Sequence, residues 1–351
     1  MSKKVRLGII GCGNIAGTHL EAYKKISEQL ELVATCDINE ERARKRQEEY
    51  GFARSYKDYG EMLAAEQLDA VSVCTWNNVH AAAAIAALQA GVNVLCEKPM
   101  AMNAEEAEAM IRAEKESGKL LMIGFVRRFG ENTEFAKRLI GSGKLGEIYY
   151  VKTGCIRRVG NPGGWFSDKK RSGGGPLIDL GVHMIDLARY LMGKPKVVSV
   201  MGSTYDKVGV RSNVKGVTQW KSIDYSEYND VEDLAAGFVR FDNGATLVLE
   251  NSWTQHIKQD KLYLELYGNK AGLQLEPEFE IYSEENDYLT DVKPVLARDD
   301  FMNIFEREIA HFVGCVANGA PCLNTSEDGL ELMKILDAIY KSAETGHEVQ
   351  L

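Results

Sequence analysis

Unbroken apolar runs alternate with helix signals over the first third of the chain. Runs of this kind are typical of parallel strands that are buried on both faces. The runs lie at 5–10, 32–36, 70–74, 92–96 and 120–124. Between them, helices are indicated by Asn39 before a segment ending near Gly51, by 81–90 before Gly91, and by Asn103 with Glu106 as a capping box before Gly118. The alternation predicts βαβ units and a doubly wound sheet.

The pattern changes after residue 124. Helices are predicted at 133–141, 301–318 and 326–345, and strands at 147–156, 197–201, 234–241, 246–253 and 261–267. Asn243-Gly244 between two of these strands is a strong hairpin signal. Residues 204–231 show no clear period and are expected to be irregular. We therefore predict an α/β protein with a first domain at 1–124 and a second α+β domain at 125–351 that contains an antiparallel sheet.

The segment 234–241 is apolar on both of its faces. Leu234, Ala236 and Phe238 point one way, and Ala235, Val239 and Phe241 point the other way. An antiparallel strand of this kind is covered on both sides, by helices on one side and by another subunit on the other. The alternative is a strand in the middle of a single-chain core. We expect a homodimer or homotetramer.

Composition excludes several classes of protein. The chain has 351 residues, 45% of them hydrophobic, and a net charge of 42 − 51 = −9. An acidic chain has no general attraction to nucleic acid or to an anionic membrane. The seven cysteines include no C-x-x-C pair, which fits reduced thiols. Arg6 interrupts the apolar stretch near the start, and no later segment reaches the length of a membrane span. We expect a cytoplasmic protein without nucleic-acid or membrane partners.

A glycine turn follows the first apolar run. Residues 11–16 read G-C-G-N-I-A, in which Gly11 permits a tight turn, Gly13 lets a pyrophosphate approach the backbone, and Ala16 allows close helix packing. Phosphates then lie at a helix N-terminus. Asp37 follows the second strand, where a carboxylate binds ribose hydroxyls and repels a 2′-phosphate, and Ile38 supplies no positive charge. The sequence favours NAD over NADP; the alternatives are a plain glycine turn and a helix-capping aspartate.

Two further segments carry candidate chemistry. Lys98 in E-K-P follows the fourth strand, at the edge of the sheet where ligands bind, although an exposed loop lysine fits equally well. The segment 173–186 places a glycine loop before Pro176, with Asp179, His183 and Asp186 on one face of the following helix. A histidine moves protons near neutral pH, and a carboxylate one turn away orients it or binds a hydroxyl. A solvated helix face and a core histidine are the alternatives. No third ligand at metal-site spacing is evident, so no metal is expected.

Together these motifs resemble the glucose–fructose oxidoreductase / inositol dehydrogenase (Gfo/Idh/MocA) family. The resemblance covers nearly the whole chain and includes the motifs at 11–16, 36–37, 69–80, 97–99, 124–129, 173–186, 241–245 and 342–346. It implies a Rossmann-type N-terminal domain and a C-terminal domain with a large, mostly antiparallel open sheet that mediates oligomers. Where the family often has proline, this chain has Trp76, which either narrows the cofactor crevice or stacks on a ligand, or is simply packed.

The resemblance also implies roles for individual residues. Lys98 contacts cofactor and substrate, while Asp179 and His183 act on the substrate hydroxyls, with the histidine as proton acceptor. The cofactor-binding residues are expected to be Gly11, Gly13, Asn14, Ile15, Asp37, Thr75, Asn77, His80, Glu97 and Lys98. Trp165, Asp168 and Arg127 are weaker candidates for substrate contacts.

The expected function is an NAD-dependent oxidoreductase acting on a sugar or cyclic polyol. Hydride leaves a hydroxyl-bearing carbon for nicotinamide while His183 accepts the proton, assisted by Lys98 and Asp179. Two alternatives remain: an enzyme that cleaves glycosides through transient oxidation, and a non-enzymatic sensor of NAD or sugar. The presence of Lys98, Asp179 and His183 argues against the sensor.

Overall fold

The computed structural model describes residues 4–217, 219–297 and 300–351. Residues 1–3 and 298–299, and residue 218 of the expected irregular segment, lie outside these ranges. The chain divides into two compact units, Met1–Val126 with Asp300–Leu330, and Arg127–Asp299 with Glu331–Leu351. The break after residue 126 lies close to the predicted one after 124. Residues 300–330 differ from the prediction, since they belong to the first unit.

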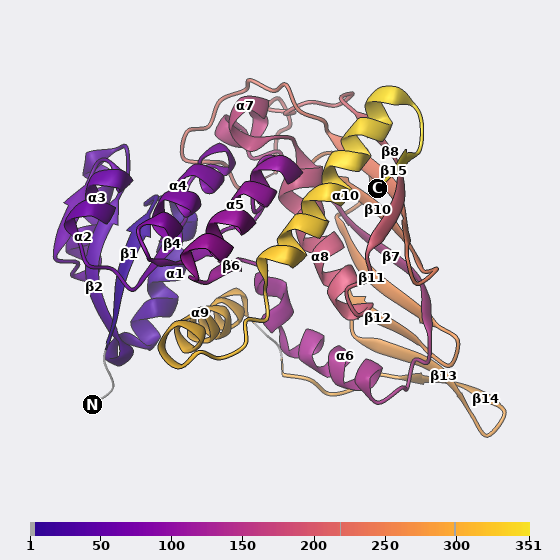
Figure 1. Cartoon of the computed structure of the whole chain (residues 1–351). Coiled ribbons are helices and arrows are strands. Elements are labelled where there is room, and N and C mark those ends of the chain that lie inside the picture. Colours follow the sequence, from indigo (N-terminus) through magenta and orange to yellow (C-terminus); the bar gives the residue numbers. More distant parts are fainter. Residues whose placement is uncertain (1–3, 218, 298–299) are drawn as a thin grey trace. The chain divides into compact units, whose positions relative to one another are not determined.

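The first unit is built on a six-stranded parallel sheet. Its strand order is β3-β2-β1-β4-β5-β6, and β1, β2, β4 and β6 are labelled in Figure 1. The strands are β1 (Val5–Ile10), β2 (Leu30–Cys36), β3 (Arg54–Tyr56), β4 (Ala70–Val73), β5 (Asn93–Cys96) and β6 (Leu121–Ile123). The helices between them are α1 (Asn14–Lys25), α2 (Glu40–Tyr50), α3 (Tyr59–Ala65), α4 (Asn77–Gln89) and α5 (Ala104–Ser117). The predicted doubly wound sheet is confirmed, and strand order reverses between β1 and β4, where such sheets bind ligands.

Helix ends follow the caps in the sequence. The Asn39 side chain accepts the Arg42 N–H at 3.1 Å at the start of α2, and Gly51 ends the helix with φ 78°. Asn103 accepts the Glu106 N–H at 2.9 Å at the start of α5. The Glu106 carboxylate bonds the Met102 N–H and thereby closes the capping box one residue early. β3 and α3 were not predicted. β3 is a short strand at the edge of the sheet and carries no apolar run.

A helix distant in sequence completes the first unit. α9 (Phe301–Asn318) packs against α1, and the rings of His19 and Phe305 lie 5.8 Å apart. Its apolar face includes Ile309 and Phe312, both fully buried. An amphipathic pattern predicts such a face but not what covers it, which is why the sequence could not assign α9 to the first unit.

The second unit holds a nine-stranded sheet in the order β14-β13-β12-β11-β7-β10-β9-β8-β15. Its strands are β7 (Ile148–Ile156), β8 (Val197–Tyr205), β9 (Leu234–Phe241), β10 (Thr246–Ser252), β11 (Lys261–Gly268), β12 (Gly272–Glu276), β13 (Glu280–Glu285), β14 (Tyr288–Val292) and β15 (Val349–Gln350). Every pair is antiparallel except β10 with β7, so the predicted mostly antiparallel sheet is confirmed. The four strands from β12 to β15 were not predicted.

Helices cover one face of this second sheet. The second unit also contains α6 (Glu131–Gly141), α7 (Lys169–Ser172) and α8 (Val182–Leu191), and most of α10 (Ser326–Thr345). α8 packs on β7 and β11. Ile339 of α10 lies against Gly202 and Gly237, where an added Cβ would meet it. None of the helices in the described part of the chain is long and apolar enough to cross a membrane.

The other face of this sheet carries a partly exposed apolar row. Phe238 follows Gly237 in β9 and therefore points away from α10. Its partners in register are Val248 on β10 and Met201 on β8, and Met201 is 54% exposed. β9 thus has the two apolar faces that the sequence indicated, with one of them against the unit's own helices.

Candidate active site

The glycine turn after β1 has the form that a dinucleotide requires. Gly11 has φ 87°, and a Cβ there would collide with the backbone of Cys74 and Thr75. A Cβ on Gly13 would meet no described atom within 4 Å, so the space above it is open. Among the described residues, no side chain caps α1, whose first turn begins at Asn14 and Ile15. These N–H groups fit a pyrophosphate.

Asp37 is held at the end of β2 beside this turn. Its carboxylate accepts the Cys12 N–H and the Asn39 N–H, each at 2.8 Å. Ile38 is 71% exposed, as expected of a residue that makes no core contact. Arg42, in the first turns of α2, was not among the predicted site residues. Its Nη1 lies 3.6 Å from Asp37 Oδ2. A carboxylate and a guanidinium therefore lie side by side where the ribose is expected.

Lys98 is held by a buried network at the end of β5. From Val94 to Ala101, a stretch described throughout, Lys98 alone is not buried. Glu97 accepts a 2.7 Å hydrogen bond from His19 Nε2 and another from the Lys98 N–H at 3.2 Å. Burial acts to raise the pKa of Glu97, but the His19 hydrogen bond and the charges of His19 and Lys98 oppose it, and the pKa is lowered. Gly124 leaves the room that Glu97 occupies.

His80 joins this turn to the segment after β4. Its Nδ1 lies 2.7 Å from the Pro99 carbonyl and its Nε2 lies 3.2 Å from the Thr75 carbonyl. Burial lowers the pKa of His80, and a neutral ring donates to one carbonyl only, so the shorter contact to Pro99 is the hydrogen bond. His80 thus positions the turn that carries Lys98. Thr75 and Trp76 are half-exposed at the start of α4, and Asn77 is buried there.

In the second unit, a distant carboxylate holds the glycine loop. Buried Glu232 accepts the Gly175 N–H at 2.9 Å and the Leu177 N–H at 3.1 Å, and Tyr340 donates to it at 3.0 Å. A Cβ on Gly175 would collide with Glu232, and one on Gly174 with Tyr340. These glycines are therefore required by close packing. Glu232 therefore supplies acceptors for backbone N–H groups at the start of the helix, next to Pro176.

The helix after this loop begins with a π turn, not with the regular α-helix that the sequence predicted. The π turn covers Leu177–Gly181 and continues into α8. From Gly174 to Leu191, a stretch described throughout, only Asp179 and His183 are not buried. Single π turns within helices often lie at functional sites. Here the turn presents two polar side chains on an otherwise buried helix.

Asp179 is oriented by a tryptophan that the sequence analysis missed. Trp253 is fully buried, and its indole N–H donates to Asp179 Oδ2 at 3.0 Å. It packs with Leu180 and Val231, and Phe166 lies edge-on to it at 6.5 Å between ring centroids. Asp179 also acts to raise the pKa of the Cys155 thiol, although burial is the larger cause of that shift. No sequence pattern links residues 179 and 253, because only the sheet brings them together.

Asp186, the third polar residue of the predicted helix face, has a structural role. Asp186 forms two hydrogen bonds to the buried Arg128 guanidinium, at 2.6 Å and 3.0 Å. The Arg128 guanidinium also lies over the Tyr190 ring at 4.8 Å. Paired buried charges of this kind fix neighbouring segments. Asp186 is therefore separate in role from Asp179 and His183.

Of the three weaker substrate candidates, Asp168 and Arg127 are engaged with neighbouring charged side chains, whereas Trp165 presents an aromatic ring. Trp165 is half-exposed and stacks on Phe166 at 3.9 Å, which places it in the aromatic group next to Trp253. Asp168 caps α7 and binds Arg171 at 2.7 Å. Arg127 Nη1 lies 3.6 Å from the Glu276 carboxylate. Burial raises the pKa of Glu276, and the Arg127 charge opposes this. Trp165 is thus the one of these candidates with a face suited to a sugar ring.

A polar cavity of about 930 Å³ is lined in part by Glu232 and Tyr340. Most of its lining comes from the irregular segment after β8, including Asp206, Arg211 and Asn229. Neither Asp179 nor His183 lines it. The cavity is therefore separate from the two accessible polar groups on the helix.

Comparison with known proteins decides the family. Residues 5–125 match the model of an oxidoreductase family with an NAD-binding Rossmann fold, and residues 137–351 match its C-terminal alpha/beta domain. The chain belongs to the Gfo/Idh/MocA oxidoreductase family. It is an oxidoreductase of a family whose relatives are sugar and polyol dehydrogenases.

Two curated members and one solved structure of this kind are similar over the full length. The chain is 36% identical to D-glucoside 3-dehydrogenase of Escherichia coli (strain K12), over 100% of this chain and 98% of that protein. It is 28% identical to myo-inositol 2-dehydrogenase of Thermotoga maritima, over 99% and 98%. A levoglucosan dehydrogenase in complex with NADH has the same fold, with a TM-score of 0.86, 24% identity and 99% coverage of both chains.

Proposed function

We propose that the protein is an NAD-dependent dehydrogenase that oxidises a secondary ring hydroxyl of a sugar or cyclic polyol. The observation that carries the proposal is the exposure of Asp179 and His183 on a helix that is otherwise buried. The two curated relatives are named for the oxidation of a ring position of a glucoside and of an inositol. The greater similarity to D-glucoside 3-dehydrogenase favours a pyranoside oxidised at its C3 hydroxyl.

His183 is proposed as the general base that removes the hydroxyl proton, which is work suited to an imidazole near neutral pH. Asp179 is proposed to bind a neighbouring hydroxyl, with Trp253 holding its carboxylate at 3.0 Å. Lys98 is proposed to stabilise the developing alkoxide with its positive charge. Trp165 is proposed to lie against the apolar face of the sugar ring.

The cofactor residues fit NAD. The open space above Gly13 and the uncapped start of α1 suit the pyrophosphate, and Asp37 suits the ribose hydroxyls. NAD, when bound, supplies the hydride acceptor. Asp37 keeps NADP at a disadvantage by charge repulsion, and Arg42 balances only part of that charge at 3.6 Å. Asn14, Ile15, Thr75, Asn77 and Glu97 are proposed to complete the cofactor site.

The test is a substrate screen for net formation of NADH. Purified protein and NAD are mixed with methyl glucosides, free aldoses and inositols, and NADH absorbance is followed. We expect NADH with a glucoside and recovery of the 3-keto product by mass spectrometry and NMR. Release of the aglycone without net NADH would replace the dehydrogenase by a glycoside-cleaving enzyme. Ligand-dependent stabilisation without turnover of any compound would favour a sensor.

A further inference from the structure

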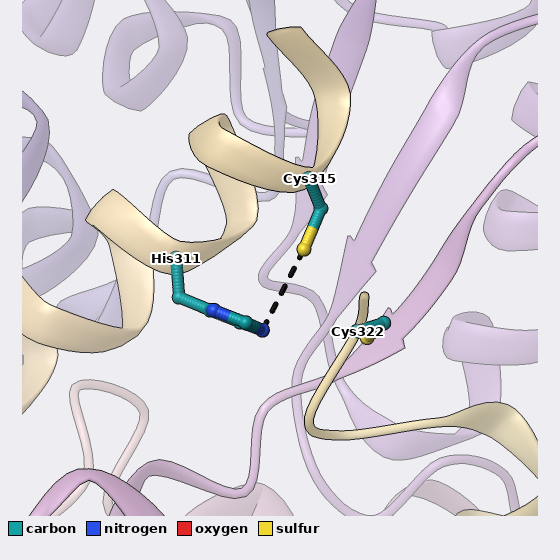
Figure 2. Close-up of side chains that lie close together, drawn as sticks. All are labelled: His311, Cys315 and Cys322. Carbon is teal, nitrogen blue, oxygen red and sulfur yellow. Dashed lines mark hydrogen bonds between the residues drawn. The ribbon is translucent and has the colours of Figure 1, made fainter. Parts of the chain in front are cut away.

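Three metal-ligating side chains meet at the C-terminal end of α9 in the first unit. His311 and Cys315 are four residues apart on one face of the helix, and Cys322 comes from the loop that follows it (Figure 2). His311 Nε2 lies 3.5 Å from Cys315 Sγ, and the three ligand atoms all lie within 4.8 Å of one another. Cys315 is buried, and the other two are half-buried.

These separations approach the edges of a metal tetrahedron. Zinc bonds of about 2.3 Å to sulfur and about 2.0–2.1 Å to nitrogen give a nitrogen–sulfur edge of about 3.5 Å and a sulfur–sulfur edge of about 3.8 Å. The His311–Cys315 distance of 3.5 Å already matches the first edge. The widest separation, at most 4.8 Å, needs to close by no more than about 1.3 Å, whichever pair of ligand atoms it joins. A small movement of the Cys322 loop completes the site.

His311 already presents the correct nitrogen. Its Nε2 accepts the Leu323 N–H at 3.0 Å, so this nitrogen carries a lone pair and the ring proton resides on Nδ1. Metal binding exchanges the Leu323 N–H for the cation and releases the two thiol protons to solvent.

The loop that carries Cys322 is anchored on both sides of the group. Gly319 ends α9 with φ 67° and turns the chain back along the helix. The Asn324 carbonyl accepts the Ile123 N–H of β6 at 3.1 Å, and its side chain donates to Glu308 at 3.3 Å. Cys322 is therefore held near the last turns of α9 by bonds that do not involve the cluster.

We propose that His311, Cys315 and Cys322 bind a zinc ion, with water in the fourth position, which fastens the loop after α9 to the helix. Two thiolates and an imidazole are a ligand set that selects zinc and cuprous copper over magnesium or calcium. The spacing H-x₃-C-x₆-C has no C-x-x-C element, so this stretch of the sequence carries no familiar zinc motif. The site is independent of the proposed dehydrogenase function, and its test does not depend on turnover.

The test uses reduced, metal-free full-length protein titrated with Co²⁺ and then with Zn²⁺. We expect one equivalent of Co²⁺ to give thiolate charge-transfer bands and the d–d bands of tetrahedral cobalt, and Zn²⁺ to displace it. Cys322→Ser and His311→Ala should each weaken binding by at least about tenfold, since each removes a ligand. Zinc should raise the Tm of the unsubstituted protein but not that of Cys322→Ser. Cys155→Ser, a half-buried cysteine of the other unit, is the matched control and should keep the cobalt spectrum.

Two results would overturn the proposal. One is that the reduced protein binds neither cobalt nor zinc, or that the Cys322→Ser variant binds them as tightly as the unsubstituted protein does. The other is a cobalt spectrum without thiolate charge transfer. Formation of a Cys315–Cys322 disulfide in air, with no metal binding by the reduced thiols, would assign the pair to redox chemistry instead. Because Cys322 lies in a half-buried loop, its serine variant is expected to fold.

Discussion

The bond between Trp253 and Asp179 gives the sharpest prediction about substrate binding. Trp253→Phe keeps a buried aromatic ring but removes the indole N–H that donates to Asp179 Oδ2 at 3.0 Å. A hydrogen bond to a charged group contributes about 1.5–3 kcal/mol, which converts to a loss of about 10-fold to 150-fold in kcat/KM. NAD affinity should not change, because the indole belongs to the substrate side.

The assay is steady-state kinetics with the best substrate, with NAD binding measured separately by calorimetry. Trp220→Phe is the matched control, because it is the same substitution at a tryptophan that is 54% exposed. The indole that donates to Asp179 belongs to Trp253 and is kept in this variant. A predominant rise in KM would show that Asp179 binds a hydroxyl, and a fall in kcat would show that it orients His183. Urea unfolding of both variants separates a general loss of packing from this effect.

A double-mutant cycle decides whether the indole acts through the carboxylate. In the Asp179→Asn background, Trp253→Phe should cost less than about 0.5 kcal/mol in transition-state binding, because its partner is already altered. Additive losses, or a Trp253→Phe enzyme with normal kcat/KM, would refute the positioning role of Trp253.

Three further predictions concern the cofactor, assembly and pH. Asp37→Ser should raise the KM for NAD and improve the use of NADP, since Arg42, 3.6 Å away, is left to bind a 2′-phosphate; kinetics with both cofactors measure this. Light scattering should give a multiple of 39.0 kDa, and Phe238→Glu should reduce it by placing charge on the open apolar row. Glu97→Gln should cost about 1.5–3 kcal/mol of stability at pH 7 in denaturant unfolding. Because the folded pKa of Glu97 is lowered, this stability is present above the unfolded pKa of about 4.3 and is lost as pH falls through the lower folded value.

The predictions for the cofactor, for assembly and for pH dependence each have a control or an outcome that would contradict them. Adding Arg42→Ala to Asp37→Ser should remove the gain with NADP, and a gain that persists would exclude Arg42 as the phosphate ligand. Met201→Lys, on the same row, should act like Phe238→Glu, and a mass near 39.0 kDa for the unsubstituted protein at all concentrations would end the assembly proposal. A stability loss in Glu97→Gln that does not shrink below about pH 4 would contradict the sign of the pKa shift.

Local signals predicted most of the fold. β1, β9, α9 and α10 have the predicted bounds, because each combines an apolar run or an amphipathic period with a glycine or turn signal close to its end. β12 to β15 escaped prediction because they are short, with few buried side chains in β13 and β14. The place of α9 in the first unit depends on a contact with α1 across some 280 residues, which no local pattern contains.

The candidate site was predictable where it rests on motifs and not where it rests on contacts. Gly11, Asp37, Lys98, Asp179 and His183 all follow recognisable local patterns. Trp253, Glu232 and Arg42 are held beside them by the folded chain, and none lies at a spacing that signals the contact. The same holds for the His311 cluster, in which a loop supplies the third ligand.

The most direct measurement of the central claim is the pH dependence of kcat/KM for sugar oxidation, in the unsubstituted protein and in His183→Ala. A general base must be neutral to accept a proton, so kcat/KM should fall on the acid side, with a limb near neutral pH, as is usual for a catalytic histidine. His183→Ala should lose that limb and turn over about 10²–10⁴-fold more slowly, with unchanged NAD affinity. A variant that kept its turnover and its acid limb would remove His183 from the chemistry and leave Lys98 as the proton acceptor.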